Sequence, residues 1–136
     1  MAGGCGAAEP QDGDVYAIGP NDRWFRDPAF SQLAAAQQAV GAPAPRDRVR
    51  IAHLDTGYDP NHPTRPEFLR TDLQRNVADA DRPNDATDRP TAEINPMFGH
   101  GTGTIGILAG NVFDGAKLGG APNLEVVPIR VANWVV

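Results

Sequence analysis

The sequence predicts an α/β fold built around a mainly parallel sheet. Apolar, β-branched runs at residues 48–54 and 124–131 are typical of buried strands, and helical patterns lie between them. Strands that alternate with helices in this way form parallel sheets. Only these two strand patterns stand out in the 136 residues, and an open sheet of two strands leaves both edges unpaired. We therefore expect the chain to be an incomplete, N-terminal portion of such a sheet.

The N-terminal part of the chain predicts a mobile segment followed by a helix. Residues 1–20 are small, acidic and glycine-rich, and we expect them to be mobile. Asp27 is a good N-cap, Pro28 suits the first helical position, and Gly41 stands where the helix would end. The spacing of its larger side chains predicts one buried stripe, formed by Phe30, Leu33, Ala34, Gln37 and Val40.

The two strand patterns frame the rest of the fold. The first runs directly into Asp55-Thr56-Gly57, and its apolar character suits the middle of a parallel sheet. In the second, Pro128 has no N–H to donate, so we expect its pairing to be limited on one side. The expected elements between them are a short helix at 66–75, a polar, proline-rich surface loop at 79–96, and a helix near 100–110.

Composition excludes several classes of protein. The net charge is −5, with Lys+Arg 12 against Asp+Glu 17, and no basic cluster stands out, so we expect no nucleic-acid partner. No apolar run reaches the roughly 18 residues of a membrane span, and the N-terminus does not read as a signal peptide. The single cysteine, Cys5, predicts neither an internal disulfide nor a zinc site, and the compartment stays open.

The glycine-rich segment at residues 98–110, FGHGTGTIGILAG, fits more than one kind of site. Gly101, Gly103 and Gly106 match the G-x-G-x-x-G pattern of dinucleotide sites. That pattern binds a pyrophosphate only where a hydrophobic strand leads directly into it, and the preceding segment contains Pro96 and no β-branched run. Glu125 stands at about the distance expected of a ribose-binding acid but begins a strand. A dinucleotide site is therefore a third-ranked alternative.

A metal site is a second interpretation. Its available ligands are His53, Asp55, His62 and His100. His53 and Asp55 share one face of the first strand by alternation, but no H-E-x-x-H or paired Cys/His spacing is present. An EF-hand-like start at Asp79 and Asp81 is broken by Pro83 and Pro90. The sequence therefore does not predict a catalytic zinc ion.

The third interpretation joins Asp55 with His100. Asp55 lies at the carboxyl end of a buried strand, where open α/β sheets place their sites. His100 lies at the start of the next predicted helix, between two glycines. A carboxylate that orients an imidazole is two-thirds of a nucleophilic triad. Gly103 and Gly106 would each cost about 1 kcal/mol against alanine inside a helix, which is understandable if the helix packs very close to the sheet.

Two ordered motifs carry a resemblance to a known family. Residues 51–57, IAHLDTG, followed by Asn61-His62-Pro63, resemble the aspartate motif of subtilases, the subtilisin-like serine proteases. Residues 99–102, GHGT, followed by Gly106 and by Ala109-Gly110, resemble their histidine motif. Residues 120–131 look like the segment that follows in the family, and residues 20–25 resemble its N-terminal approach, so that the resemblance covers residues 20–134.

The resemblance implies a fold and an activity. The fold would be doubly wound, with a mainly parallel sheet and helices on both faces, and residues 21–136 would be a partial subtilisin-like peptidase domain. The activity would be serine-type hydrolysis of a peptide or protein substrate, with Asp55 and His100 as catalytic residues. No cofactor is predicted; calcium is possible through the resemblance alone, since Thr64 replaces an acidic residue that can bind it. Gly103 stands where the family often has a second histidine.

The third member of the triad has no candidate in the sequence. The only serine, Ser31, falls inside the predicted N-terminal helix. Cys5 lies in the glycine-rich tail, and Thr102 and Thr104 are better placed to cap the helix that begins at His100. We therefore expect the chain alone to be inactive and to need a C-terminal part that supplies the serine and the oxyanion hole. A non-catalytic, protease-derived remnant or binding module is the alternative.

Overall fold

The computed structural model describes residues 25–89, 98–113 and 115–134. The segment predicted to be mobile, residues 20–24 of the resemblance and residues 90–96 of the predicted loop lie outside these ranges. The elements are α1 (Leu33–Val40), β1 (Arg50–Asp55), β2 (Arg75–Asn76), α2 (His100–Ala109), β3 (Val112–Phe113), β4 (Ala116–Lys117) and β5 (Glu125–Arg130), with short 3₁₀ turns at Pro45–Asp47 and Thr71–Leu73.

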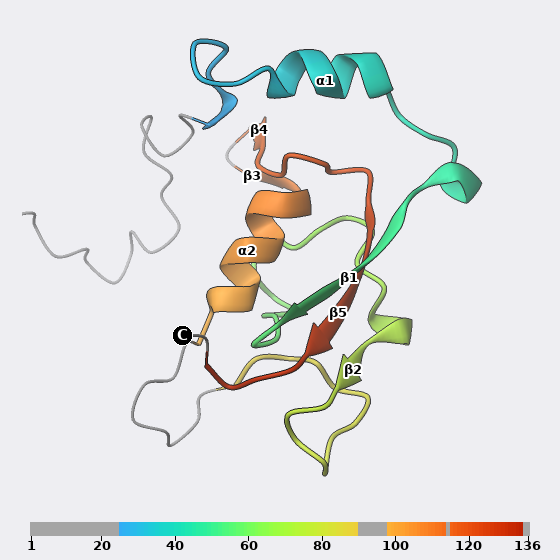
Figure 1. The fold of residues 1–136 in the computed structure, drawn as a ribbon, viewed down its shortest axis with the longest axis vertical. Coiled ribbons are helices and arrows are strands. Elements are labelled where there is room, and N and C mark those ends of the chain that lie inside the picture. Colours follow the sequence, from blue (N-terminus) through green and yellow to red (C-terminus); the bar gives the residue numbers. More distant parts are fainter. Residues whose placement is uncertain (1–24, 90–97, 114, 135–136) are drawn as a thin grey trace, which may run out of the picture.

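The main sheet is parallel, as predicted. Its strand order is β1-β5-β2, and β1 pairs with β5 from Arg50 opposite Glu125 to Asp55 opposite Arg130. Figure 1 shows β1 and β5 running side by side in the same direction, with β2 beyond β5. The middle strand of the described sheet is thus β5, and the prediction that the first strand lies in the middle is wrong for this part of the chain.

Pro128 limits the pairing of β5 on one side, as its missing N–H predicts. The N–H of Val126 donates to Phe68 O at 3.0 Å, so alternate residues of β5 point their N–H groups toward β2. Pro128 follows two residues later and falls between the bridge of Leu69 with Val126 and the start of β2. The ladder on this side is therefore broken at the proline, whereas the β1 side is continuous.

Helix α2 packs on the sheet and forms the core with it (Figure 1). Ile105 and Ala109 from α2 meet Val126 from β5, and all three are buried. The partly buried residues around them are Ile51, Leu69, Leu108 and Leu124. This core is small, and it lies directly beneath the helix that begins with His100.

Helix α1 is shorter and more exposed than the sequence predicts. The carboxylate of Asp27 accepts the N–H of Ala29 at 2.8 Å and closes a turn, and the helix itself begins only at Leu33. Gly41, with φ of 68°, ends it as predicted. No residue of α1 is buried, and Val40 is 77% exposed, so the predicted buried stripe is wrong.

The helix predicted at residues 66–75 does not form. Its backbone pairs instead with β5: Arg70 N–H donates to Val126 O at 2.8 Å, and only Thr71–Leu73 makes a 3₁₀ turn. Tertiary pairing outweighs local helix propensity here because it satisfies backbone groups beside the core. The antiparallel hairpin of β3 and β4 is an element that the sequence did not predict.

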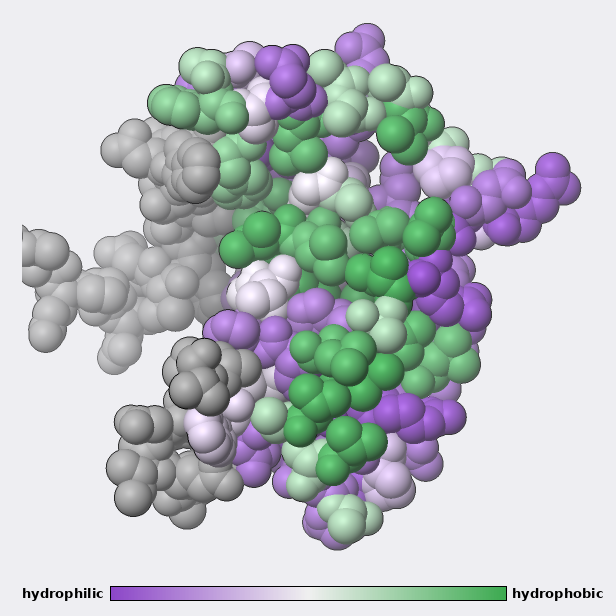
Figure 2. Space-filling view, in the orientation of Figure 1, coloured by the Kyte–Doolittle hydropathy of each residue, from purple (hydrophilic) through white to green (hydrophobic). Residues whose placement is uncertain are grey.

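Apolar side chains remain on the surface of the described residues. Figure 2 shows them across the middle of the face on which β1 and β5 lie. Leu54 on β1 is 60% exposed and Ile107 on α2 is 61% exposed. None of the helices in residues 25–89, 98–113 and 115–134 has the length and apolar character needed to cross a bilayer.

Candidate active site

Asp55 and His100 meet at the carboxyl edge of the sheet. Asp55 is the last residue of β1 and His100 is the first residue of α2, 45 residues later. Asp55 Oδ1 and His100 Nδ1 are 2.7 Å apart, the distance of a charge-assisted hydrogen bond. The Asp55 side chain is 10% exposed and that of His100 is 33% exposed. The carboxylate is therefore enclosed, while the imidazole can be reached from solvent.

Glycines allow α2 to lie close enough for this contact. A Cβ atom on Gly101 would overlap the carbonyl oxygen of Gly57, and one on Gly106 would lie 3.0 Å from Thr64 Oγ1. The sequence predicts close packing at Gly103 and Gly106. Gly106 does pack closely, although against Thr64 and not against a strand, whereas the prediction is wrong for Gly103, where a Cβ atom would meet nothing within 4 Å. The close approach at Gly101 was not predicted.

The start of α2 is fixed by a buried ion pair. Gly99, with φ of 87°, precedes the helix and donates its N–H to Asp88 Oδ2 at 2.7 Å. Asp88 in turn pairs with Arg130 at 2.9 Å, and the two side chains are 3% and 1% exposed. Gly101 N–H donates to Thr56 Oγ1 at 3.2 Å, and the Arg130 guanidinium also donates to Thr56 O. These bonds tie the backbone beside His100 to the backbone beside Asp55.

The charge of Asp55 is stabilised by three donors. Besides His100, Thr56 N–H donates to Oδ1 at 2.7 Å and Thr104 Oγ1 donates to Oδ2 at 3.0 Å. Burial by itself would raise the pKa of this carboxyl, but the hydrogen bonds outweigh burial and hold the pKa below its ordinary value. Asp55 is therefore ionised at neutral pH and can only accept hydrogen bonds.

The proton positions follow from this ionisation. Because Asp55 only accepts, the proton of the contact belongs to His100 Nδ1, which donates it to Oδ1. In the neutral imidazole the other ring nitrogen, Nε2, then carries a lone pair. An imidazole oriented in this way can take a proton at Nε2, and the carboxylate would stabilise the imidazolium that forms.

The other predicted interpretations find less support in the described residues. The N–H of Gly99, just before α2, and that of Gly101, in its first turn, already donate to Asp88 and Thr56, so these two groups are not open to a pyrophosphate. No three side chains of His, Cys, Asp or Glu come together there in a group that could hold a metal ion. Asp79, the start of the EF-hand-like segment, pairs with Arg82 and Arg130 at 2.7 and 3.2 Å. A calcium ion therefore does not fit at Asp79, whose carboxylate is already paired with these two arginines.

Of the three histidines considered as metal ligands, the fold brings His53 and His100 together around Asp55 and keeps His62 apart. His53 joins the site, because its Nε2 lies 3.0 Å from Thr104 Oγ1 and 3.8 Å from Asp55 Oδ2. His62 contacts Thr64 Oγ1 through Nδ1 at 2.7 Å, within its own turn.

Sequence patterns missed three residues of this site. Thr104 stands four positions after His100 and so lies on the same helix face, a spacing that could have identified it. Asp88 and Arg130 carry no such signal. They are 42 residues apart and meet only because a loop and the end of β5 fold together.

Within the described residues, each hydroxyl considered as a nucleophile is hydrogen-bonded to a partner other than His100. Thr102 Oγ1 accepts the N–H of Asp59 at 2.9 Å, and Ser31 Oγ donates to Phe25 O at 2.6 Å. Thr104 is engaged with Asp55. Cys5 lies outside the described residues.

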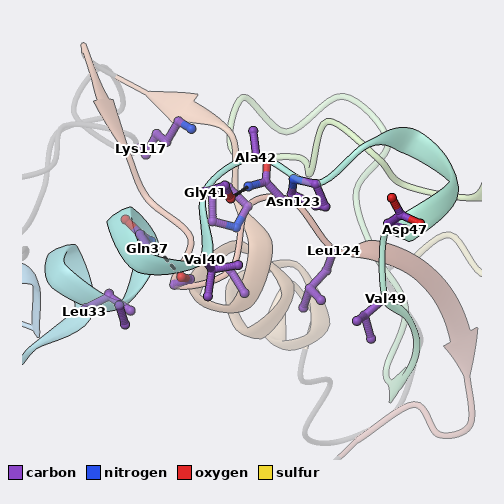
Figure 3. A pocket seen from close by; sticks show the side chains of 15 residues that line it. Leu33, Gln37, Val40, Gly41, Ala42, Asp47, Val49, Lys117, Asn123 and Leu124 are labelled. Atoms are coloured by element: carbon purple, nitrogen blue, oxygen red, sulfur yellow. Dashed lines mark hydrogen bonds between the residues drawn. The ribbon is translucent and has the colours of Figure 1, made fainter.

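A cavity of about 370 Å³ lies away from Asp55 and His100. Figure 3 shows it between α1, the segment after it, and the chain before β5, with Leu33, Val40, Val49 and Leu124 among its apolar walls. The side-chain amide of Gln37 on α1 donates to Gly120 O at 2.7 Å and so links α1 to the chain that precedes β5. Neither Asp55 nor His100 lines this space, so the cavity is separate from the candidate active site.

The comparison with protein families agrees with the motifs. A model described as the subtilase family matches residues 46–134, more than half of the 136 residues. The matched range contains both Asp55 and His100. Comparisons with curated proteins and with solved structures gave no match.

Proposed function

The chain belongs to the subtilase family, and we propose that it provides the aspartate and histidine of a serine endopeptidase. The observation that carries this proposal is the 2.7 Å contact between Asp55 Oδ1 and His100 Nδ1. The substrate is a peptide or protein, as the family implies. In this proposal residues 21–136 are part of a peptidase domain whose complete sheet is doubly wound, with helices on both faces.

The roles follow from the geometry. His100 Nε2 would take the proton of a serine hydroxyl as that oxygen attacks the scissile carbonyl. Asp55, held by three donors, would stabilise the imidazolium that results. His100 would then give the proton to the leaving amine, and an acyl-enzyme would remain for water to hydrolyse. The exposure of His100, 33%, is compatible with access from a substrate cleft.

The serine and the oxyanion hole belong to a second segment in this proposal. Ser31 is the only serine in the sequence, and its hydroxyl is bonded to Phe25 O. In subtilisin itself, removal of the catalytic serine lowers turnover about 10⁶-fold. We therefore expect the 136-residue chain alone to show no peptidase activity and no labelling by a fluorophosphonate.

Complementation tests the proposal. The chain is mixed or co-expressed with a C-terminal segment of a subtilase domain that carries the serine and the oxyanion-hole asparagine. Peptidase activity is then measured on a casein or peptide-anilide substrate. Recovered activity that disappears with His100→Ala supports the proposal. The matched control is His62→Ala, since His62 lies in a turn apart from the pair and its loss should leave activity in place.

Persistent absence of activity in a complex that demonstrably forms would favour the alternative, a protease-derived binding module. Formation of the complex is followed by size-exclusion chromatography, so that a failure to associate is not mistaken for a failure of chemistry. Labelling of the chain alone by the fluorophosphonate would contradict the assignment of the serine to a second segment.

A further inference from the structure

Two side chains beside Asp55, His53 and Thr104, form a group whose joint role the scheme above leaves unassigned. His53 precedes Asp55 by two residues on β1, so both side chains lie on the same face of the strand. Thr104 follows His100 by one turn of α2. The Thr104 hydroxyl lies 3.0 Å from Asp55 Oδ2 and 3.0 Å from His53 Nε2. The His53 side chain is 13% exposed, so this group is largely enclosed.

The protons of this group can be assigned from valence. The Asp55 carboxylate only accepts, and the single proton of the Thr104 hydroxyl has two acceptors within reach, Asp55 Oδ2 at 3.0 Å and Gly101 O at 3.2 Å. The carboxylate is charged and closer, so we assign the proton to Oδ2. With that proton directed at Oδ2, the hydroxyl can only accept from His53. His53 must then carry its proton on Nε2. The chain of donors runs from His53 through Thr104 to Asp55 and leaves Oδ1 to His100 and to Thr56 N–H.

We infer that His53 and Thr104 are positioning residues, which hold the Asp55 carboxylate in the rotation that presents Oδ1 to His100. This inference deepens the proposed function and rests on it. A carboxylate bonded on one oxygen can turn about its Cβ–Cγ axis, whereas bonds to both oxygens fix its plane. The imidazole that Asp55 orients is fixed in turn, and orientation of the base is the role of the acid in a triad.

The surroundings of His53 keep it neutral while it donates. Burial is the largest influence on the pKa of His53 and lowers it. The charge of Asp55 raises this pKa and His100 lowers it, and the resulting pKa lies below the ordinary value. On β5 its neighbour is Pro128, which carries no charge, and on α2 it meets Thr104 and His100. A neutral His53 does not compete with the imidazolium of His100 for the charge of Asp55.

NMR of the unmodified chain tests the assignment directly. The sequence has only three histidines, so single substitutions assign every imidazole in long-range ¹H–¹⁵N spectra. At neutral pH we expect His53 as the Nε2–H tautomer and a downfield, exchange-protected Nδ1–H resonance from His100. Finding His53 as the Nδ1–H tautomer would overturn the inference without any variant. Absence of the His100 resonance would overturn both the inference and the proposed function.

A matched pair of variants tests the positioning role. Thr104→Val removes the hydroxyl at nearly constant volume, and we expect loss of the protected His100 Nδ1–H resonance. Thr104→Ser keeps the hydroxyl, and we expect this variant to retain the protected His100 Nδ1–H resonance. The His62 signals are the internal control, because His62 lies outside the group. The Nδ1–H resonance of His100 and its exchange rate could instead be the same in Thr104→Val as in the unmodified chain. That result would refute the positioning role of Thr104 and would leave the proposed contact of Asp55 with His100 unaffected.

Discussion

Gly101 lies directly against Gly57, so closely that a Cβ atom on Gly101 would overlap the Gly57 carbonyl oxygen. Gly101→Ala must therefore push α2 away from the end of β1. We expect it to lower the free energy of unfolding by about 1–3 kcal/mol, the usual cost of overpacking, and to weaken the His100–Asp55 contact. Urea denaturation followed by circular dichroism measures the first effect.

The same helix offers a matched control for this prediction. Gly103 has open space where its Cβ atom would lie, so Gly103→Ala should only improve helix propensity. We expect a gain of up to about 1 kcal/mol in the same urea experiment. Equal effects of the two alanines would show that close packing against Gly57 is not the reason for Gly101.

The buried ion pair of Asp88 and Arg130 predicts a large loss from a single substitution. Arg130 is 1% exposed, and Arg130→Met would leave the carboxylate of Asp88 without its partner in a buried position. We expect a loss of about 3–5 kcal/mol in unfolding free energy. Asp72→Asn is the control, since Asp72 pairs with Arg70 at the exposed surface and should leave stability almost unchanged. A loss no larger than that of the control would contradict the role of Arg130 as the anchor of Asp88.

The lowered pKa of His53 predicts a pH dependence of stability. The unfolded chain, with a histidine pKa of about 6.5, takes up the proton before the folded chain does. Stability is therefore lost as pH falls below about 6.5, because the unfolded state binds more protons there. The lowered pKa of Asp55 also makes stability fall with pH, but only below about pH 3.9, where the unfolded carboxylate begins to take up a proton.

His53→Gln isolates this contribution, since glutamine can still donate to Thr104 but does not titrate. Melting temperatures measured from about pH 7 to about pH 5 should fall less steeply for the variant than for the unmodified chain. Parallel curves for the two proteins would show that His53 has the same pKa folded and unfolded.

The carboxylate of Asp55 predicts a specific kinetic defect in the complemented enzyme. Asp55→Asn keeps the size of the side chain but no longer favours the Nδ1–H form of His100. We expect kcat to fall by about 10⁴, the size of the effect of the equivalent change in a Ser-His-Asp protease, with little change in KM. Asp81→Asn, on an exposed residue of the loop, should leave kcat unchanged. A rise in KM with kcat preserved would argue against orientation of His100 by Asp55.

Local pattern was enough to predict the features that depend on neighbours along the chain. The apolar run that became β1, the glycine-flanked start of α2 at His100 and the break at Pro128 all follow from periodicity and propensity. The motifs around Asp55 and His100 were also enough to identify the family, because the order and spacing of their residues are properties of the sequence itself.

Other features depend on contacts between distant segments and become visible only in the folded molecule. The extended path of residues 66–70 exists because β5 offers backbone partners, and α1 begins late because Asp27 closes a turn of its own. The group of His53, Thr104 and Asp55 joins β1 to a helix about 50 residues further along the chain. Such contacts arise when the sheet and its helix pack together, and no local propensity encodes them.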